Sequence, residues 1–175
     1  MKKLFFLIAI QLMCVHTFVV NAQRIFSTSY TMDDGLAANR VYSILQDSCG
    51  FMWFGTKDGL NRYDGKTFKT FKHNPGQKAG LGNSLIKCLM EDEAHRLWVG
   101  TDSGLYIYDP ETERFTDLPL YDPEGKLITK PIAGLERDPK GCIWITVEAN
   151  GVFRHDPRTG RTENCYRERR ALRTL

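Results

Sequence analysis

The sequence predicts an all-β fold, a partial β-propeller of about three four-stranded blades that follows an N-terminal signal peptide. Two observations carry this prediction. Trp53, Trp98 and Trp144 recur at spacings of 45 and 46 residues, and each has an aspartate six residues before it. Turn signals also divide each repeat into short apolar segments. A repeat of roughly 40–50 residues is typical of a propeller blade.

The start of the chain has the pattern that is typical of an export signal. Two lysines are followed by the apolar run 4–10, and the small-residue motif V-N-A ends at residue 22, so we expect residues 1–22 to be a cleaved signal peptide. An uncleaved membrane anchor is the alternative, which the polar Gln11 disfavours. Lipid attachment at Cys14 is disfavoured by the bulky Met13 before it. The mature chain is therefore expected in the periplasm, without membrane contact of its own.

The remaining chain, about 150 residues, has the length of one domain. The arginine-rich tail 167–175 is expected to be disordered, and it holds much of the positive charge, so nothing favours nucleic acid as a partner. Four cysteines remain after cleavage, none in a C-x-x-C pair, which disfavours a zinc site. No metal or cofactor is expected, and the disulfide state stays open.

The first repeat divides into four expected strands with turns between them. An Asp-containing turn follows the first strand, and a D-G hairpin turn follows the second, where aspartate caps the backbone and glycine allows positive φ. The expected strands cover 41–45, 51–55, 60–63 and 67–71 in this repeat, 86–89, 97–101, 105–108 and 115–118 in the second, and 132–135, 143–145, 152–154 and 162–165 in the third.

The third repeat departs from the pattern. Thr146 replaces a glycine, His155 replaces a tyrosine, and one extra residue precedes Gly151. Its outer strand also lacks the phenylalanine found in the other two. We expect a weaker terminal blade, and an incomplete blade is the alternative.

The need to bury apolar sheet faces explains why the sequence repeats. A small sheet that is apolar on both faces must pack against neighbours, so each tryptophan is expected between adjacent blades. The recurring Asp47, Asp92 and Asp138 are expected to cap turns rather than to catalyse a reaction. The glycine two residues after the tryptophan suits a strand so close to the central axis that a side chain would obstruct neighbouring backbone.

The phrase D-x-x-G-x-x-W-x-G-T-x-x-G-L-x-x-Y-D resembles the two-component regulator propeller repeat over residues 26–166. The opening segment 30–36, YTMDDGL, also resembles the start of the mature sensor region of that family. The repeat signature consists of Asp47, Trp53, Gly55, Gly59, Asp92, Trp98, Gly100, Gly104, Asp138, Trp144 and Gly151.

This resemblance implies the N-terminal periplasmic sensor part of a hybrid two-component system, a histidine kinase with a response regulator. Many relatives detect oligosaccharides, so a glycan is the expected ligand. The repeats would occupy residues 23–166, with blades at about 36–72, 81–120 and 128–166. A closed ring commonly needs 4–8 blades, so the chain is expected to be truncated, with the remaining blades or another copy as partner. Lacking a kinase signature, the chain itself is not expected to be an enzyme.

Candidate ligand-binding residues lie in the loops that follow the second strand of each blade. They are Lys57, Asp58, Asp102, Ser103, Glu148 and Asn150. No catalytic constellation stands out, and His73, His95 and His155 are interpreted as separate surface histidines. Two other functions remain open: an interaction scaffold that is not a sensor, and a propeller hydrolase or lyase acting on glycans.

Overall fold

The computed structural model describes residues 27–77 and 79–165; the expected signal peptide and the arginine-rich tail lie outside this range. The described residues form three four-stranded antiparallel sheets and one 3-10 turn, η1 (Met32–Asp34). Strand order within each sheet follows the sequence, so every sheet is a simple meander. This confirms the prediction of an all-β chain with three propeller blades.

The strand bounds agree with the expected segments to within about two residues. Blade 1 contains β1 (Val41–Gln46), β2 (Met52–Thr56), β3 (Gly59–Tyr63) and β4 (Phe68–Phe71). Blade 2 contains β5 (Ile86–Glu91), β6 (Leu97–Thr101), β7 (Leu105–Asp109) and β8 (Arg114–Asp117). Blade 3 contains β9 (Ile132–Arg137), β10 (Ile143–Val147), β11 (Gly151–Asp156) and β12 (Arg161–Asn164).

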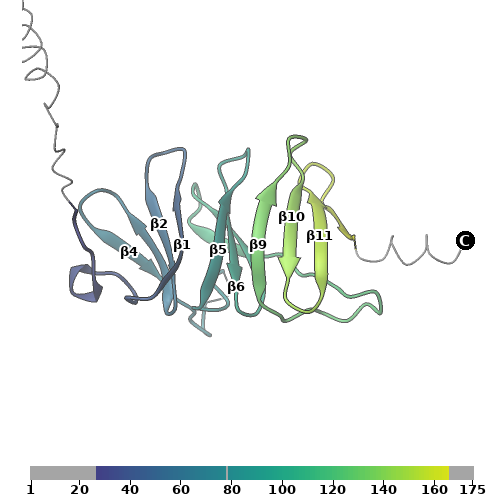
Figure 1. Ribbon diagram of the computed structural model, residues 1–175, viewed down its shortest axis with the longest axis horizontal. Helices are drawn as coiled ribbons and strands as arrows, with labels where there is room; N and C mark the ends of the chain where they lie inside the picture. The colour runs from purple at the N-terminus through teal and green to yellow at the C-terminus, as the bar shows by residue number, and fades with distance from the viewer. Residues whose placement is uncertain (1–26, 78, 166–175) are drawn as a thin grey trace, which may run out of the picture.

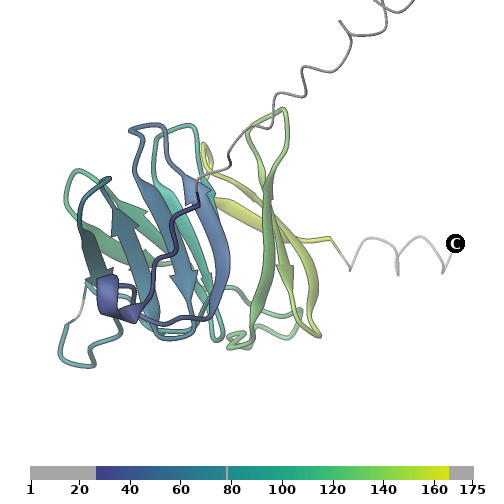
Figure 2. The same ribbon diagram turned by 60° about the vertical axis from the view of Figure 1, so that its left-hand side comes forward.

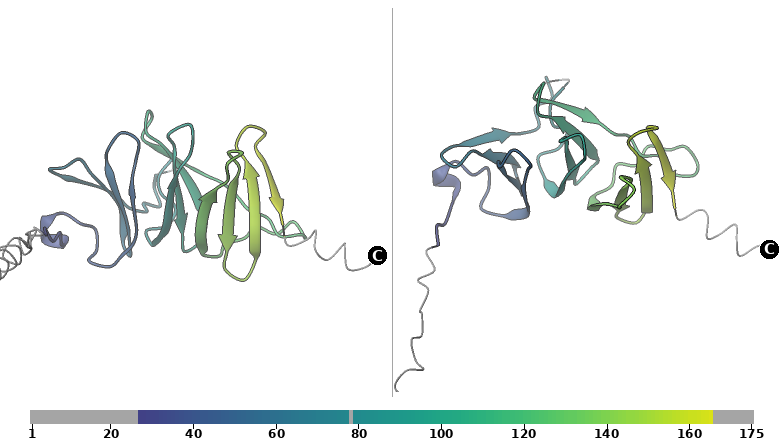
Figure 3. Two further views of the ribbon diagram at one scale, coloured as in Figure 1. Left: turned by 45° about the horizontal axis from the view of Figure 1, so that its top comes forward. Right: turned by 90° about the horizontal axis from the view of Figure 1, so that it is seen from above.

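The three blades stand side by side with blade 2 in the middle (Figure 1). Seen from above, they follow an arc and do not form a closed ring (Figure 3). The first strand of each blade lies next to the first strand of its neighbour, since β5 contacts both β1 and β9. The innermost strands therefore form the concave side of the arc.

Two apolar cores lie between the blades. Trp53 from blade 1 packs with Val99 and Tyr108 from blade 2 in the first core. Trp98 from blade 2 packs with Ile132 and Phe153 from blade 3 in the second. The Trp53 and Trp98 side chains are almost fully buried, and each large aromatic side chain contributes on the order of 150–250 Å² of buried area. Burial between blades thus stabilises sheets that could not fold singly.

An aspartate organises the turn after the first strand of each blade. One carboxylate oxygen of Asp47, Oδ1, accepts the Phe51 N–H at 2.9 Å, and Asp138 Oδ1 accepts the N–H groups of Lys140 and Cys142, both at 2.9 Å. These carboxylates cap the turns, and their second oxygens accept an indole N–H from the tryptophan six residues later.

The glycine after each buried tryptophan leaves room for the next blade. A Cβ on Gly55 would lie 2.7 Å from Cγ2 of Ile86, and one on Gly100 would lie 2.9 Å from Cγ2 of Ile132. The expectation that neighbouring backbone causes the crowding is therefore wrong, because side chains cause it. An isoleucine of the following blade does so at both positions, and the Cys88 sulfur of the same blade also does so at Gly100. Thr146 occupies the corresponding position in blade 3 and is exposed.

The third blade has all four strands, so the alternative that it is incomplete is wrong, whereas its expected outer strand is present as β12. Strand β12 pairs with β11 through four residue pairs, including His155 with Thr162. A polar contact replaces the Tyr–Phe pair of the other blades, because His155 Nδ1 lies 2.8 Å from Thr162 Oγ1. The interpretation of His155 as a surface residue is also wrong, since only 5% of it is exposed. Burial lowers the pKa of this histidine.

Candidate functional site

The six predicted ligand-binding residues lie in the loops β2–β3, β6–β7 and β10–β11. Because the three blades run in the same direction, these loops share one end of the array, the lower end in Figure 1. In the first loop, Lys72 Nζ lies 2.6 Å from Asp58 Oδ2. The Thr56 hydroxyl supports this hairpin by donating to the Gly59 carbonyl at 2.8 Å. Lys57 and Asp58 belong to a tight two-residue turn and border no described cavity.

A lysine brings two of the predicted residues together across the blade boundary. Lys87 Nζ, from β5, lies 3.5 Å from Asp102 Oδ1 and 3.9 Å from Glu148 Oε1. The lysine joins the β6–β7 loop of blade 2 to the β10–β11 loop of blade 3. This contact could not be predicted from the sequence, since Lys87 is an ordinary polar residue of an alternating strand.

Ser103 and Asn150 lie in separate recesses. The Ser103 hydroxyl accepts a hydrogen bond of 2.9 Å from Asn83 Nδ2 and borders a cavity beside β7. Asn150 borders a second, more open recess of about 430 Å³ with Asp122 and Glu124. The six predicted residues therefore share an end of the molecule, yet they do not form one site.

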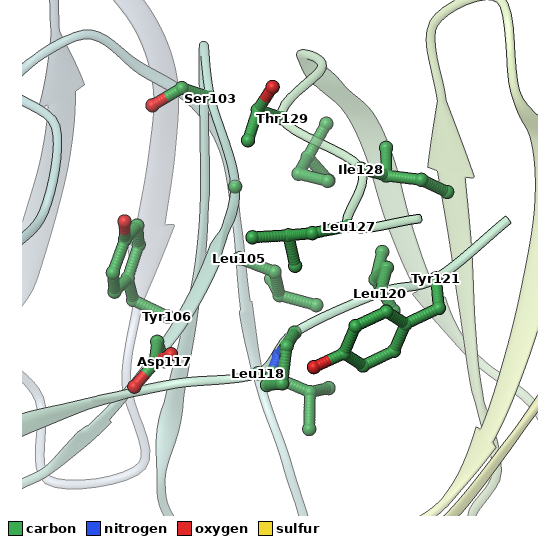
Figure 4. A pocket seen from close by; sticks show the side chains of 13 residues that line it. Ser103, Leu105, Tyr106, Asp117, Leu118, Leu120, Tyr121, Leu127, Ile128 and Thr129 are labelled. Carbon is green, nitrogen blue, oxygen red and sulfur yellow. The ribbon is translucent and has the colours of Figure 1, made fainter. Parts of the chain in front are cut away.

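The cavity beside Ser103 combines an apolar lining with a few polar groups. Its volume is about 310 Å³, and it lies between the outer strands of blade 2 and the connection 118–131 (Figure 4). Leucine and isoleucine side chains form most of the lining, and the polar groups come from Ser103, Tyr106, Asp117 and Thr129. A largely apolar pocket with a few convergent polar groups is typical of a small-molecule site.

The outer rim of this cavity is unusually apolar for an exposed segment. Tyr121 and Leu127 form an isolated antiparallel bridge and are 53% and 50% exposed. In Figure 4, Leu127 reaches across the centre of the cavity, and the Tyr121 ring lies beside Leu118. The rim therefore presents an aromatic ring and a branched aliphatic side chain to anything that enters.

Asp117 supplies the formal charge of the cavity. No other described residue donates a hydrogen bond to its carboxylate or pairs with it. Burial of the neighbouring Tyr106 raises the pKa of that phenol, and the negative charge of Asp117 raises it further. Tyr106 therefore stays protonated at neutral pH, and in Figure 4 its hydroxyl points away from Asp117.

A serine, a histidine and a glutamate also meet on the opposite end of the array. Ser48 Oγ lies 2.6 Å from Glu91 Oε1 and 2.7 Å from His95 Nδ1. Here the hydroxyl donates to the carboxylate, whereas a catalytic serine must pass its proton to the histidine. Ser48 and His95 lie on exposed turns, with His95 at 66% side-chain exposure, whereas Glu91 is the last residue of β5. The cluster links the first turn of blade 1 to that of blade 2.

The described residues hold neither a metal-binding cluster nor a membrane-spanning helix. Within 27–77 and 79–165, no three His, Cys, Asp or Glu side chains are grouped to hold a metal ion. Over the same ranges, no helix has the length and apolar character needed to cross a bilayer.

Parts of this chain are similar in sequence to a known family and to a known protein. The family described as two component regulator propeller matches residues 35–58 and 80–103. Histidine kinase P4 of Formosa agariphila is 51% identical over 47 residues, which is 27% of this chain and 3% of that protein.

Solved structures extend the similarity to most of the chain. The extracellular domain of BT3049 from B. thetaiotaomicron, assigned as a hybrid two-component system, superposes with a TM-score of 0.70 at 26% identity, covering 78% of this chain and 19% of that one. The extracellular domain of BT4673 from the same organism, assigned as a one-component system, reaches 0.50 at 21% identity over 83% of this chain and 28% of that one, a likeness of fold alone. The chain thus spans less than a third of these structures.

Proposed function

We propose that this chain, which is built of two-component regulator propeller repeats, is part of a hybrid two-component sensor. It would be the extracellular part that senses the ligand. The kinase step would belong to other parts of such a sensor, and the blades would provide ligand contacts. An extracellular or periplasmic position agrees with the BT3049 domain, which is extracellular.

The observation that carries a binding role is the cavity bordered by Ser103, Asp117 and Tyr121. One of its lining residues, Ser103, belongs to the loops where the sequence predicts ligand contacts. An uncompensated carboxylate and nearby hydroxyls suit a ligand with several hydroxyl donors, and the exposed ring suits a ligand with an apolar face. A pyranose ring has both properties. We propose an oligosaccharide as the ligand and one of its sugar rings as the group bound here.

Calorimetric titration of the chain with a panel of neutral and acidic oligosaccharides tests this function. We expect at least one to bind. Tyr121→Ala should weaken that binding by about two- to tenfold, because a stacked ring contributes roughly 0.5–1.5 kcal/mol. Asp117→Asn should weaken it by roughly 10–100-fold, because a hydrogen bond to a charged group contributes about 1.5–3 kcal/mol.

The matched control is Tyr42→Ala, which removes another exposed tyrosine from the inner strand of blade 1. This variant should bind as the unchanged chain does. Binding that is insensitive to both Tyr121 and Asp117 would exclude the cavity as the site, and failure of the whole panel would exclude glycan sensing by these blades.

Two other functions make different predictions for the same samples. A hydrolase or lyase would convert the oligosaccharide, which chromatography of the titrated mixture would detect as smaller products. An interaction scaffold would bind no glycan, and the complete gene would encode no kinase segment.

A further inference from the structure

His155 lies in the interface between blades 2 and 3. Figure 2 shows blade 3, in green and yellow, beside the teal strands of blade 2. The ring centroids of His155 and Trp98 are 5.4 Å apart. Across the interface between blades 1 and 2, Tyr108 and Trp53 make the equivalent contact, with centroids 5.2 Å apart. One of the two interfaces therefore contains an imidazole, whose charge changes close to neutral pH.

The His155 ring is enclosed by groups from both blades. The residue is almost fully buried, and the Trp98 ring on which it packs is fully buried. On the side of blade 3, Nδ1 of the ring lies 2.8 Å from Thr162 Oγ1 in β12, and the His155 backbone pairs with Ile143 in β10. Adding a proton would place a positive charge inside this enclosure, which costs free energy unless a partner compensates it.

The charged groups near His155 do not remove this cost. Burial is the largest cause that lowers the pKa of His155 below its ordinary value of 6.5; the charge of Asp156 raises the pKa, and that of Arg96 in blade 2 lowers it further. Both nearby carboxylates already have an arginine partner. Asp156 Oδ1 lies 3.2 Å from Arg158 Nε. Asp92 Oδ2 lies 2.8 Å from Arg96 Nη2.

The interface between blades 1 and 2 responds differently to acid. Burial raises the pKa of Tyr108 above its ordinary value of 10.0, so this phenol is uncharged at neutral and at acid pH. Its hydroxyl accepts a hydrogen bond of 3.4 Å from Arg62 Nη1. His95 also lies where these two blades meet, but its side chain is 66% exposed, so solvent would surround a charge there.

We propose that His155 makes the interface between blades 2 and 3 sensitive to acid: a proton taken up from solvent by its imidazole loosens this interface, while the interface between blades 1 and 2 stays closed. The proton is released again when the pH rises, so the change is reversible. Ile132 belongs to the same apolar core as Trp98 and also lines the cavity beside Ser103. Acid would therefore loosen one wall of that cavity, whichever ligand binds there.

The lowered pKa fixes the direction of the effect. Folding favours the neutral ring, so this contribution to stability is complete above about pH 6.5 and is lost as the pH falls through the lower value of the folded state. The Asp92 carboxylate, whose pKa lies below 3.8, stays ionised while this happens. The two groups therefore act in different pH ranges.

Hydrogen exchange of the indole N–H groups, followed by nitrogen-15 NMR, tests the proposal within one molecule. Protection factors remove the intrinsic pH dependence of exchange. Between about pH 7.5 and about pH 5, the protection factor of Trp98 should fall at least about threefold, because the neutral ring is favoured only in the closed interface. The protection factor of Trp53 should stay constant over the same range.

Two variants remove the titrating group. His155→Tyr supplies the residue found at the equivalent position of blade 2, and His155→Gln keeps a polar partner for Thr162 if the larger phenol does not fit. Either variant should abolish the loss of Trp98 protection in acid. His95→Gln, which removes an exposed histidine elsewhere, is the matched control and should keep the full loss.

Three results would overturn the proposal. The first is a Trp98 protection factor in the unchanged chain that is equal or higher in acid. The second is a loss that persists in the folded His155 variants or disappears in His95→Gln. The third is an equal loss at Trp53, which would show that acid loosens both interfaces together.

Discussion

The indole N–H of Trp98 donates a hydrogen bond of 2.9 Å to Oδ2 of Asp92, six residues before it. The other oxygen of Asp92 accepts the backbone N–H groups of Ala94 and Arg96 at 2.9 and 3.0 Å. A single carboxylate therefore closes the turn and fixes the ring that fills the blade interface. The same geometry in blades 1 and 3 explains why aspartate and tryptophan recur together at constant spacing.

Replacing Asp92 with alanine should destabilise the chain strongly. The buried indole N–H would lose its acceptor, the turn would lose its cap, and the Arg96 guanidinium would lose an ion pair of 2.8 Å. We expect the free energy of unfolding to fall by roughly 2–4 kcal/mol, measured by urea denaturation. Asp138→Ala is the matched variant and should cost clearly less, because Trp144 is only half-buried. Equal losses would contradict this role.

The Asp92 carboxylate should also make stability depend on pH. Burial raises its pKa, but hydrogen bonds from Trp98 and Arg96 and the charge of Arg96 outweigh burial, so the pKa lies below the ordinary value of 3.8. A lowered pKa in the folded state adds stability that is complete above about pH 3.8 and is lost as the pH falls through the folded value.

Asp92→Asn isolates this effect, because it removes the charge and keeps an acceptor for the indole. The difference in unfolding free energy between the unchanged chain and Asp92→Asn should shrink between pH 6 and pH 2. A difference that is constant over this range would show that the carboxylate charge contributes nothing.

A methyl group at Gly100 should weaken the contact between blades 2 and 3. Its Cβ would press on the Cys88 sulfur and lie 2.9 Å from Cγ2 of Ile132. We expect Gly100→Ala to lower the unfolding free energy by about 1–3 kcal/mol. The control is Gly134→Ala, whose nearest neighbour would be Thr146 Oγ1 at 3.8 Å. Gly134→Ala should change stability by less than about 1 kcal/mol, and an equal effect of both would contradict the crowding argument.

The cysteines should differ in reactivity. Burial raises the pKa of the Cys88 thiol to about 12, so almost no thiolate forms at pH 8. Cys142 is buried and Cys49 is exposed. Brief treatment with iodoacetamide, followed by peptide mass spectrometry, should modify Cys49 and spare Cys88 and Cys142 until urea is added. Rapid modification of Cys88 in the folded chain would show that the interface between blades 2 and 3 is open.

The blade architecture could be predicted from the sequence because it is repeated. Each Trp, Asp and Gly-containing turn appears three times, so the strand order and the buried face follow from local spacing. The completeness of blade 3 could not be predicted in this way. Its outer strand replaces the aromatic pair with His155 and Thr162, and only their hydrogen bond shows that the two substitutions belong together.

Less of the candidate site could be predicted from the sequence. The loop residues were predicted from the shared end of the blades, but only Ser103 borders the cavity proposed as the ligand site. Asp117 and Tyr121 belong to no repeated phrase, and they meet because the connection 118–131 folds back on blade 2.

The most direct test of the architecture is the solvent exposure of the three indole N–H groups in the unchanged chain. In a nitrogen-15 NMR spectrum with a soluble paramagnetic probe, the Trp144 signal should broaden strongly, while Trp53 and Trp98 should stay sharp because their rings are only 2% and 0% exposed. Equal broadening of all three signals, or a protected Trp144 beside an accessible Trp98, would contradict the stacking of blades through their tryptophan-bearing faces.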